Sequence, residues 1–429
     1  MAQETKNVTE ATLDRFTSHQ VVVIVLLAMT QFTVILDFIV MSPLGDMLMK
    51  SMSLSTTQFG AAVSVYAFSA GISGLLTAGF ADRFDRKKLL LFFYVGFIAG
   101  TLLCGLTTTY PMLLAARIVT GLFGGVIGSI SLAIVADLFP MAKRGRVMGF
   151  MQMGFGASQV LGIPISLFLA NLWGWQAPFL VIVGISTAVW LVIMFTMQPI
   201  NEHLAIRNDK NPLMHLFHTV TKGIYWVGFL ATALLTLGGF MMMPWGSAFA
   251  VNNLLVTYEQ LPILFMVSGV ASLLVMPAIG RLSDKIDKFK IFTVASVWLM
   301  VMVVIYTNLV PIPFWLVLLM NILFMVGILS RIVPAMALVT ALPEMKDRGA
   351  FMSINSSLQQ LAGGVAAMVG GLIVVQKENF SPLEHYNTLG YIIVVLSIVS
   401  IYIVYQVSRI VSGKKDEDAV VPDNAVLAE

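Results

Sequence analysis

Charge is scarce in this sequence, and so is cysteine. Only 11% of its 429 residues are Asp, Glu, Lys or Arg, against roughly 25% in a typical soluble domain. Hydrophobic residues make up 58%, which is more apolar surface than a soluble core could bury. The single cysteine, Cys104, excludes a disulfide bond within the chain. The composition therefore predicts a membrane protein.

Several kinds of reaction centre are also missing. No glycine-rich loop followed by Lys-Ser or Lys-Thr is present, so the phosphate cradle of nucleotide hydrolases is absent. The histidines of the central linker and outer loop have no cysteine or acid at metal-site spacing; they are His203, His215, His218 and His385. No pattern suggests nucleic-acid binding. We therefore expect no enzymatic activity, no metal and no organic cofactor.

Long apolar runs make up most of the chain. A membrane-spanning helix needs about 20 mostly apolar residues, and we expect six such spans in each half. In the first half they are 21–45, 57–80, 89–108, 111–137, 147–170 and 175–198. In the second half they are 223–250, 258–279, 290–309, 312–340, 350–375 and 388–409.

These runs divide the chain into five segments. They are an N-terminal tail (1–20), a six-helix bundle (21–199), a polar linker (200–222), a second six-helix bundle (223–410) and a C-terminal tail (411–429). The first tail lacks a small-residue cleavage site after a short apolar core, so we do not expect a secretory signal peptide. The predicted fold class is an all-α membrane protein.

Positive charge marks one side of the membrane. Lysine and arginine concentrate in cytoplasmic loops of membrane proteins. With the N-terminus in the cytosol, only Lys50 and Lys377 fall in outer loops, and only Arg117 and Arg331 fall inside spans, of 25 basic residues in all. We therefore expect a multi-pass protein of the plasma (bacterial inner) membrane with both termini cytoplasmic.

Two short loops recur in both halves. Residues 78–87 and 280–288 share an acid followed by a basic run, and residues 138–145 resemble 342–349. Repeats in the same orientation predict two similar bundles with a substrate site near the midplane between them.

These loops carry a resemblance to a known family. Residues 78–87 resemble the G-x-L-A-D-R-x-G-R-K signature of the major facilitator superfamily, with Ala78 and Asp85 in the two glycine places. Residues 113–121 resemble its fourth-helix motif L-x-x-x-R-x-x-Q-G, with Thr120 replacing glutamine. The resemblance implies twelve helices in two pseudo-symmetric six-helix bundles, and a role for Arg117 in proton coupling.

The fifth predicted span resembles one branch of this superfamily in particular. Residues 154–170 contain Gly162 and Pro164, a variant of the fifth-helix antiporter motif, and residues 173–179 follow it. This part of the chain is similar to the drug and sugar efflux branch of the twelve-helix proton antiporters. In that branch the motif is associated with export.

One acid lies where hydrocarbon is expected. Asp37 falls inside the first span, and a charge at membrane depth costs at least ~2.5 kcal/mol. Helix rise places Asp37 ~24 Å from the cytosolic end of its span and Arg117 ~9 Å from the outer end of its own, so both fall in the outer half. Two readings stay open. Asp37 is a proton carrier, or it forms a static pair with Arg117 that pins two helices.

The recurring loops suggest a second role for acids. Asp82 and Asp284 precede basic runs at helix ends, where they can pair with a cation or a helix N-terminus. With Arg83 and Arg86 they are predicted to latch the cytosolic side in one state. The alternative is a solvated loop acid. Arg331, toward the cytosolic end of the tenth span, either faces the cavity or extends to the membrane surface.

Amides, thioethers and aromatic rings within the spans are candidates for a substrate pocket. Flexible thioethers and aromatic faces with sparse amides suit variable, partly apolar ligands. The alternative for each is helix packing. The candidates are Gln31, Met41, Gln152, Gln159, Trp245, Asn252, Asn355 and Gln359.

The sequence thus predicts a secondary active transporter. The leading hypothesis is proton-coupled efflux of a small amphipathic compound or drug by alternating access. The alternatives are a sugar or lysolipid exporter, a proton-coupled uptake symporter, and a non-transporting receptor on the same fold. The expected partners are a small-molecule substrate and the lipid bilayer, with no nucleic acid, and the chain is expected to be a monomer.

The charge pattern generates a topological prediction. Cysteines introduced one at a time between Gly413 and Glu429 should react with a membrane-impermeant thiol reagent only after the cells are opened. Labelling of the same positions in intact cells would contradict the predicted orientation.

Overall fold

The computed structural model describes residues 16–77, 81–201, 204, 212–345, 347–378 and 380–420. Within these ranges almost all regular structure is helical, and the one strand-like pairing is an isolated bridge between Val375 and Glu384. Most of the predicted tail 1–20 and part of the predicted linker 200–222 lie outside the described residues.

The first half of the chain contains six long helical segments. They are α2 (Ser18–Val40), α4 (Thr56–Thr77), α5 (Arg86–Leu106), α6 (Tyr110–Leu138), the continuous run of α7 (Met141–Ala157), η2 (Ser158–Gly162) and α8 (Ile163–Trp173), and α9 (Ala177–Thr196). A short helix, α3 (Gly45–Met52), connects α2 to α4. The fifth segment differs from the predicted unbroken span because η2 is a π-helical turn, which ends two residues before Pro164.

The second half repeats this arrangement. A short helix α10 (Pro212–Thr221) lies in the predicted linker. The long segments are α11 (Gly223–Phe240) with η4 (Met243–Trp245) and α12 (Gly246–Asn252), then α13 (Leu261–Lys285), α14 (Lys288–Thr307), α15 (Phe314–Ala341), α16 (Arg348–Ile373) and α17 (Tyr386–Val420). The last helix continues into the segment 411–429 that was predicted as a tail.

Within the described ranges, eleven helical segments are long and apolar enough to cross a membrane. The remaining predicted span, 350–375, is the eleventh along the chain and corresponds to α16, which has 26 residues but carries Asn355, Ser357 and Gln359 along its length. Asn355 and Ser357 are buried, so this helix is shielded by protein and does not need the apolar composition of its neighbours. The twelve-helix prediction is confirmed.

The departure from the family signature at Asp85 has a local explanation. Its carboxylate accepts hydrogen bonds from the backbone N–H groups of Lys87 and Lys88 at 2.8 and 3.2 Å, and so caps α5. Asp287 caps α14 in the same way, through the N–H of Lys290 at 2.9 Å. Aspartate is a favoured residue at this position because its side chain satisfies otherwise unpaired N–H groups.

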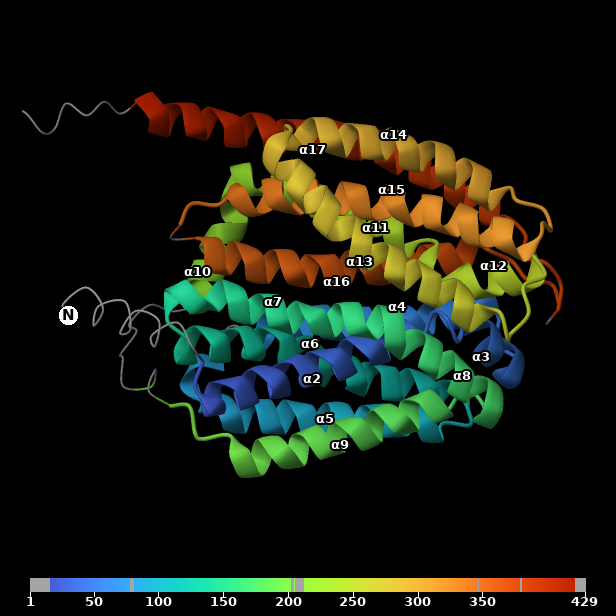
Figure 1. The fold of residues 1–429 in the computed structure, drawn as a ribbon, viewed down its shortest axis with the longest axis horizontal. Helices are drawn as coiled ribbons and strands as arrows, with labels where there is room; N and C mark the ends of the chain where they lie inside the picture. The colour runs from blue at the N-terminus through green and yellow to red at the C-terminus, as the bar shows by residue number, and fades with distance from the viewer. Residues whose placement is uncertain are drawn as a thin grey trace, which may run out of the picture.

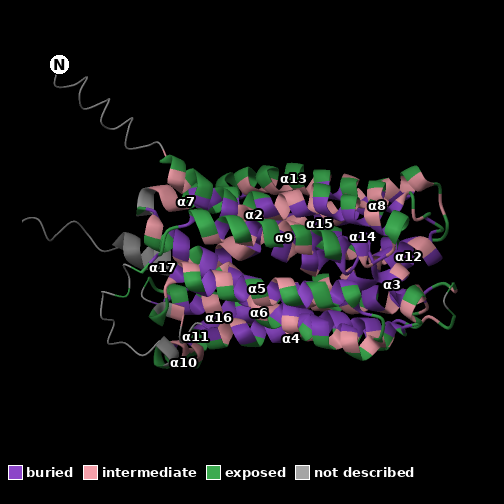
Figure 2. Ribbon diagram, turned by 90° about the horizontal axis from the view of Figure 1, so that it is seen from below, coloured by how far each residue is buried: buried purple, intermediate pink, exposed green. Residues whose placement is uncertain are grey.

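The helices form two bundles that lie side by side (Figure 1). The first and last described residues lie at one end of the molecule, with α10, and we call this the termini end. The short helices α3 and α12 lie at the opposite end, with α8, and we call it the α3–α12 end. Exposed residues follow the outer faces of helices such as α5, α9 and α13 along their lengths (Figure 2). Many are large and apolar, among them Phe195, Leu274 and Val294, as expected for surfaces that face lipid.

Small residues bring the bundles together along α4 and α16. A Cβ added at Gly60 would lie 2.8 Å from the carbonyl oxygen of Ala367, so only glycine permits this approach. Ser64 Oγ donates to the carbonyl of Gly364 at 2.8 Å across the same contact. Close backbone approach through small residues is the usual way that helices associate in a membrane.

Candidate functional site: a buried ion pair and a closed end

Asp37 of α2 and Arg117 of α6 form an ion pair inside the N-terminal bundle. Arg117 Nη1 donates to Asp37 Oδ2 at 3.0 Å, and both side chains have 0% exposure. Two residues that the sequence predicted at similar depth are therefore in direct contact.

The pair is only partly satisfied. Among the described residues, Asp37 Oδ1 and the Nε and Nη2 atoms of Arg117 have no hydrogen-bond partner, and neither does Oγ1 of Thr101. A pair that only holds two helices together is expected to satisfy its remaining donors and acceptors, because each unmet buried group costs free energy. Buried polar groups without hydrogen-bond partners call for a functional explanation.

Glycines allow the helices to close around the pair. A Cβ at Gly121 of α6 would come within 2.4 Å of the Tyr66 carbonyl oxygen on α4. A Cβ at Gly162 would lie 2.6 Å from Cδ1 of Leu36, the residue before Asp37. Gly162 of the fifth-helix motif thus fits α2 closely at the depth of the acid, and Pro164 follows in the first turn of α8.

Aromatic rings connect the pair to the other bundle. The guanidinium carbon of Arg117 lies 4.4 Å from the centre of the Tyr66 ring. Tyr66 stacks on Phe38 with centroids 5.1 Å apart, and Phe38 lies 5.9 Å from Phe240 of α11. Phe38 follows Asp37 in the chain, so a continuous line of contacts joins the ion pair to the C-terminal bundle.

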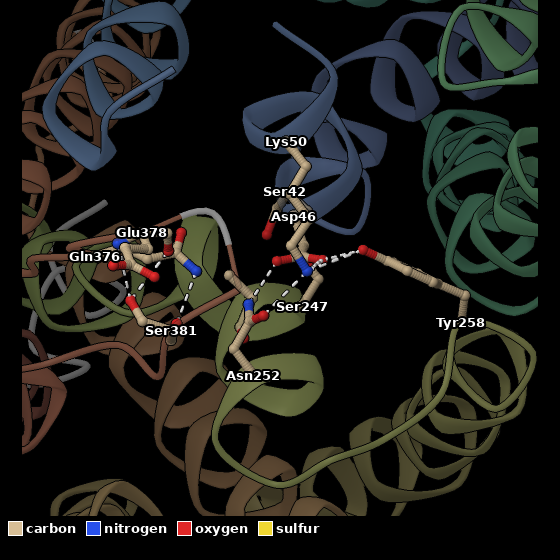
Figure 3. Close-up of polar contacts among 10 residues, drawn as sticks. Ser42, Asp46, Lys50, Ser247, Asn252, Tyr258, Gln376, Glu378 and Ser381 are labelled. Atoms are coloured by element: carbon tan, nitrogen blue, oxygen red, sulfur yellow. Dashed lines mark hydrogen bonds and ion pairs between the residues drawn. The ribbon is translucent and has the colours of Figure 1, made fainter. Parts of the chain in front are cut away.

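A polar network joins the two bundles at the α3–α12 end (Figure 3). The Asp46 carboxylate accepts hydrogen bonds from Lys50 Nζ at 2.9 Å, Asn252 Nδ2 at 2.6 Å and the Tyr258 hydroxyl at 2.5 Å. Lys50 also donates to Asn252 Oδ1 at 3.0 Å. Asp46 is 1% exposed. We call these four residues, Asp46, Lys50, Asn252 and Tyr258, the α3–α12 network.

Further contacts support the network. Asn171 of α8 donates to the Tyr258 carbonyl at 2.8 Å, and Ser247 of α12 donates to the Ser42 carbonyl at 2.8 Å. Burial and the hydrogen bond to Asp46 raise the pKa of Tyr258, so its hydroxyl remains a donor near neutral pH. Thr56 donates to the Val374 carbonyl at 2.7 Å. The α3–α12 end is therefore closed between the bundles.

The predicted latch residues lie at the termini end. Arg83 and Asp284 are exposed, and Asp284 makes no hydrogen bond or ion pair with the described residues. The side chain of Asp82 is outside the described part of the chain. Arg86 is buried and donates to Asp137 Oδ2 at 2.9 Å, a residue of the same bundle. The latch remains a prediction.

Arg331 is buried among helices of the C-terminal bundle. It is 4% exposed within the C-terminal bundle, where Nη1 donates to Ser397 Oγ at 3.0 Å and its guanidinium carbon lies 5.5 Å from the centre of the Phe292 ring. It packs between helices and does not extend to the membrane surface.

The predicted substrate residues differ in how far they are buried. Met41, Trp245 and Asn355 are buried, and Trp245 packs edge-on to Phe59 of the other bundle with centroids 5.4 Å apart. Asn252 belongs to the α3–α12 network. The remaining amides are at least partly exposed; they are Gln31, Gln152, Gln159 and Gln359. Their role in binding stays a prediction.

Three residues of the α3–α12 network were absent from the predicted site. Asp46 and Lys50 are four residues apart, the spacing at which helical side chains meet, and this signal was available in the sequence. Tyr258 gave no such signal, because its partner lies in the other half of the chain.

Comparisons with known proteins place this geometry in context. The Major Facilitator Superfamily model matches residues 27–367. An uncharacterised MFS-type transporter of Bacillus subtilis, YbcL, is 24% identical over 388 residues, covering 88% of this chain and 95% of the relative. A probable sugar efflux transporter of Helicobacter pylori strain G27 is 24% identical over 345 residues, covering 79% of this chain and 85% of the relative.

Two solved structures have the same fold. A bacterial homologue of the human lysosomal transporter Spinster, in an inward-facing and unoccupied conformation, has a TM-score of 0.74 at 16% identity, covering 93% of this chain and 99% of that one. A D-xylose–proton symporter has a TM-score of 0.73 at 16% identity, covering 89% and 97%.

The closed end generates a prediction. Asp46→Asn should open it, because the neutral amide has one acceptor oxygen instead of two and cannot accept all three hydrogen bonds from Lys50, Asn252 and Tyr258. Hydrogen bonds to a charged group are worth roughly 1.5–3 kcal/mol each. Reaction of a Ser247→Cys probe with an impermeant thiol reagent added outside should accelerate about tenfold or more, in a Cys104→Ser background.

The matched control is Glu384→Gln. It removes the Lys377–Glu384 pair, which is exposed and lies on a loop joined to the same end, and exposed pairs contribute little. Equal labelling rates in the Asp46→Asn, Glu384→Gln and unmodified backgrounds would show that the network does not hold this end closed.

Proposed function

This chain belongs to the major facilitator superfamily, and from that premise we propose that it exports a small amphipathic compound in exchange for protons by alternating access. The observation that carries the proposal is the partly satisfied Asp37–Arg117 pair, fully buried at membrane depth. The proposal requires no cofactor besides the proton and no second copy of the chain.

Proton binding at Asp37 would change the contact between α2 and α6. With the carboxyl ionised, Arg117 Nη1 and Asp37 Oδ2 attract each other at 3.0 Å. A proton on the carboxyl removes that ionic attraction, while Arg117 keeps the Tyr66 ring as a neighbour. Two states of the pair therefore correspond to two packing arrangements of the helices that hold it.

The contacts among Tyr66, Phe38 and Phe240 connect this change to the other bundle. A shift of α2 would move Phe38, which contacts Tyr66 and Phe240. Phe240 lies on α11, close to Gly363 of α16. Protonation in one bundle would thereby alter how the bundles meet, which is what coupling of a proton to alternating access requires.

The α3–α12 network would be the gate on the outer side. With the termini end assigned to the cytosol, the conformation described here would admit substrate from the cytosol and release the proton to it. Opening the outer side requires Asp46 and Lys50 to leave Asn252 and Tyr258.

The direction and the substrate class rest on two further observations. Export is favoured by the fifth-helix pattern around Gly162 and Pro164 and by the relative named as a probable sugar efflux transporter. Sugar export is therefore the second candidate. Uptake is the alternative because a D-xylose–proton symporter shares the fold.

The proposal predicts the behaviour of Asp37→Asn. Deleting the titratable group should abolish uphill transport driven by an imposed pH gradient in vesicles, while substrate binding survives. The single variant also leaves Arg117 unpaired, which costs roughly 3–5 kcal/mol and lowers stability.

A double variant separates coupling from stability. Asp37→Asn with Arg117→Gln removes both charges, so thermal stability should recover toward that of the unmodified protein. If Asp37 carries the proton, uphill flux stays absent although the protein is folded. A static pair predicts that flux recovers together with stability, and that result would refute the proposed coupling role. A panel of drugs and sugars in the same vesicles identifies the substrate class.

A further inference from the structure

A cavity lies away from the ion pair and from the α3–α12 network. It has a volume of about 360 Å³ and is lined by α13, α14 and α15. Its wall is apolar except at two positions, Ser330 and Lys290. Nothing in the proposed transport cycle uses it.

The cavity opens on the side of the bundle that faces lipid. Three of its wall residues, Leu282, Val294 and Trp298, are exposed by 40%, 72% and 42%. Large apolar side chains exposed to this degree on membrane helices contact the hydrocarbon of the bilayer. Its natural occupant is therefore a molecule that arrives through the membrane.

The floor of the cavity is held in place. Trp298 Nε1 donates to the carbonyl oxygen of Leu323 at 2.9 Å. A Cβ at Gly327 would lie 3.0 Å from Trp298 Cδ1, so glycine makes room for the indole. The ring is thus fixed against α15 and gives the cavity a defined apolar surface.

Positive charge lies at the mouth of the cavity. Lys290 is the third residue of α14 and lines the opening, and helix rise places Trp298 about 12 Å deeper. Arg281 and Lys285 are exposed near the same helix ends, and neither makes a side-chain hydrogen bond with the described residues. The acids of this loop are Asp284, which is exposed, and Asp287, which caps α14.

We propose that this cavity binds an anionic phospholipid of the leaflet on the termini side. An acyl chain would lie on Val294 and Trp298, and the phosphate would meet Lys290 with Arg281 nearby. A phospholipid fits this arrangement because the cation lies at the membrane interface and the apolar floor lies about 12 Å deeper. Basic pockets between helices on the cytoplasmic side recognise anionic headgroups in this way.

The internal repeat supplies a matched control. Lys88 is the third residue of α5 and Lys290 is the third residue of α14, and each donates its backbone N–H to the aspartate that caps its helix. Lys88→Gln therefore removes the same charge, at the same depth, from the other bundle.

The test uses the full-length protein in phosphatidylcholine nanodiscs that contain increasing fractions of phosphatidylglycerol with brominated acyl chains. Bromine quenches tryptophan fluorescence on contact, and the difference between the unmodified protein and Trp298→Phe isolates the signal at the cavity. Lys290→Gln should shift the midpoint of this quenching to an about fivefold higher lipid fraction, as expected for one lysine at an anionic surface. Lys88→Gln should leave the midpoint unchanged.

Other outcomes would overturn the proposal. Equal midpoints for Lys290→Gln and the unmodified protein would mean that the cavity does not recognise the headgroup. An equal shift in both lysine variants would mean a general attraction of the protein to anionic membrane. Brominated phosphatidylcholine that quenches Trp298 at the same low fraction would mean that the cavity takes any lipid. Weaker substrate binding by Lys290→Gln, without a change in the lipid midpoint, would reassign the cavity to substrate.

Discussion

A carboxylate can be held at membrane depth only if a partner compensates for its lost hydration, and the N-terminal bundle is built around that requirement. Asp37 meets Arg117 at 3.0 Å with both side chains fully buried. The helices that carry them must approach closely, which explains why Gly121 and Gly162 stand where any side chain would collide with a neighbour. Atoms of the pair remain without hydrogen-bond partners among the described residues, which supports the proposal that the contact changes when a proton binds.

The two bundles meet through contacts of different strength. At the α3–α12 end, hydrogen bonds converge on the buried Asp46 carboxylate from both bundles, so this end is closed by directional and charged interactions. Nearer the ion pair, the contact from Phe38 to Phe240 is aromatic packing, which can slide at lower cost than a charged network can break. A rocking motion that pivots on packed rings and breaks a polar gate is consistent with this distribution.

Hydropathy and charge were enough to predict the twelve spans, and helix rise was enough to predict that Asp37 and Arg117 lie at similar depth. The polar α16 shows where composition alone falls short, because burial against α4 replaces the need for apolar residues. The role of Asn252 depends on its register against α3, which no local pattern in the sequence reveals. For the same reason the sequence could not show that Asn252, unlike the other amides proposed for the substrate pocket, belongs to the α3–α12 network.

In the proposed cycle, Asp37 binds and releases a proton as the protein changes state. Infrared difference spectroscopy of the reconstituted protein, recorded between acidic and neutral pH, measures that proton directly. We expect a carbonyl-stretch band of a protonated carboxyl group that is present at acidic pH and lost at neutral pH. The band should be missing from the Asp37→Asn variant and retained in the Asp46→Asn variant. A difference spectrum that is identical in the unmodified protein and in Asp37→Asn would contradict it.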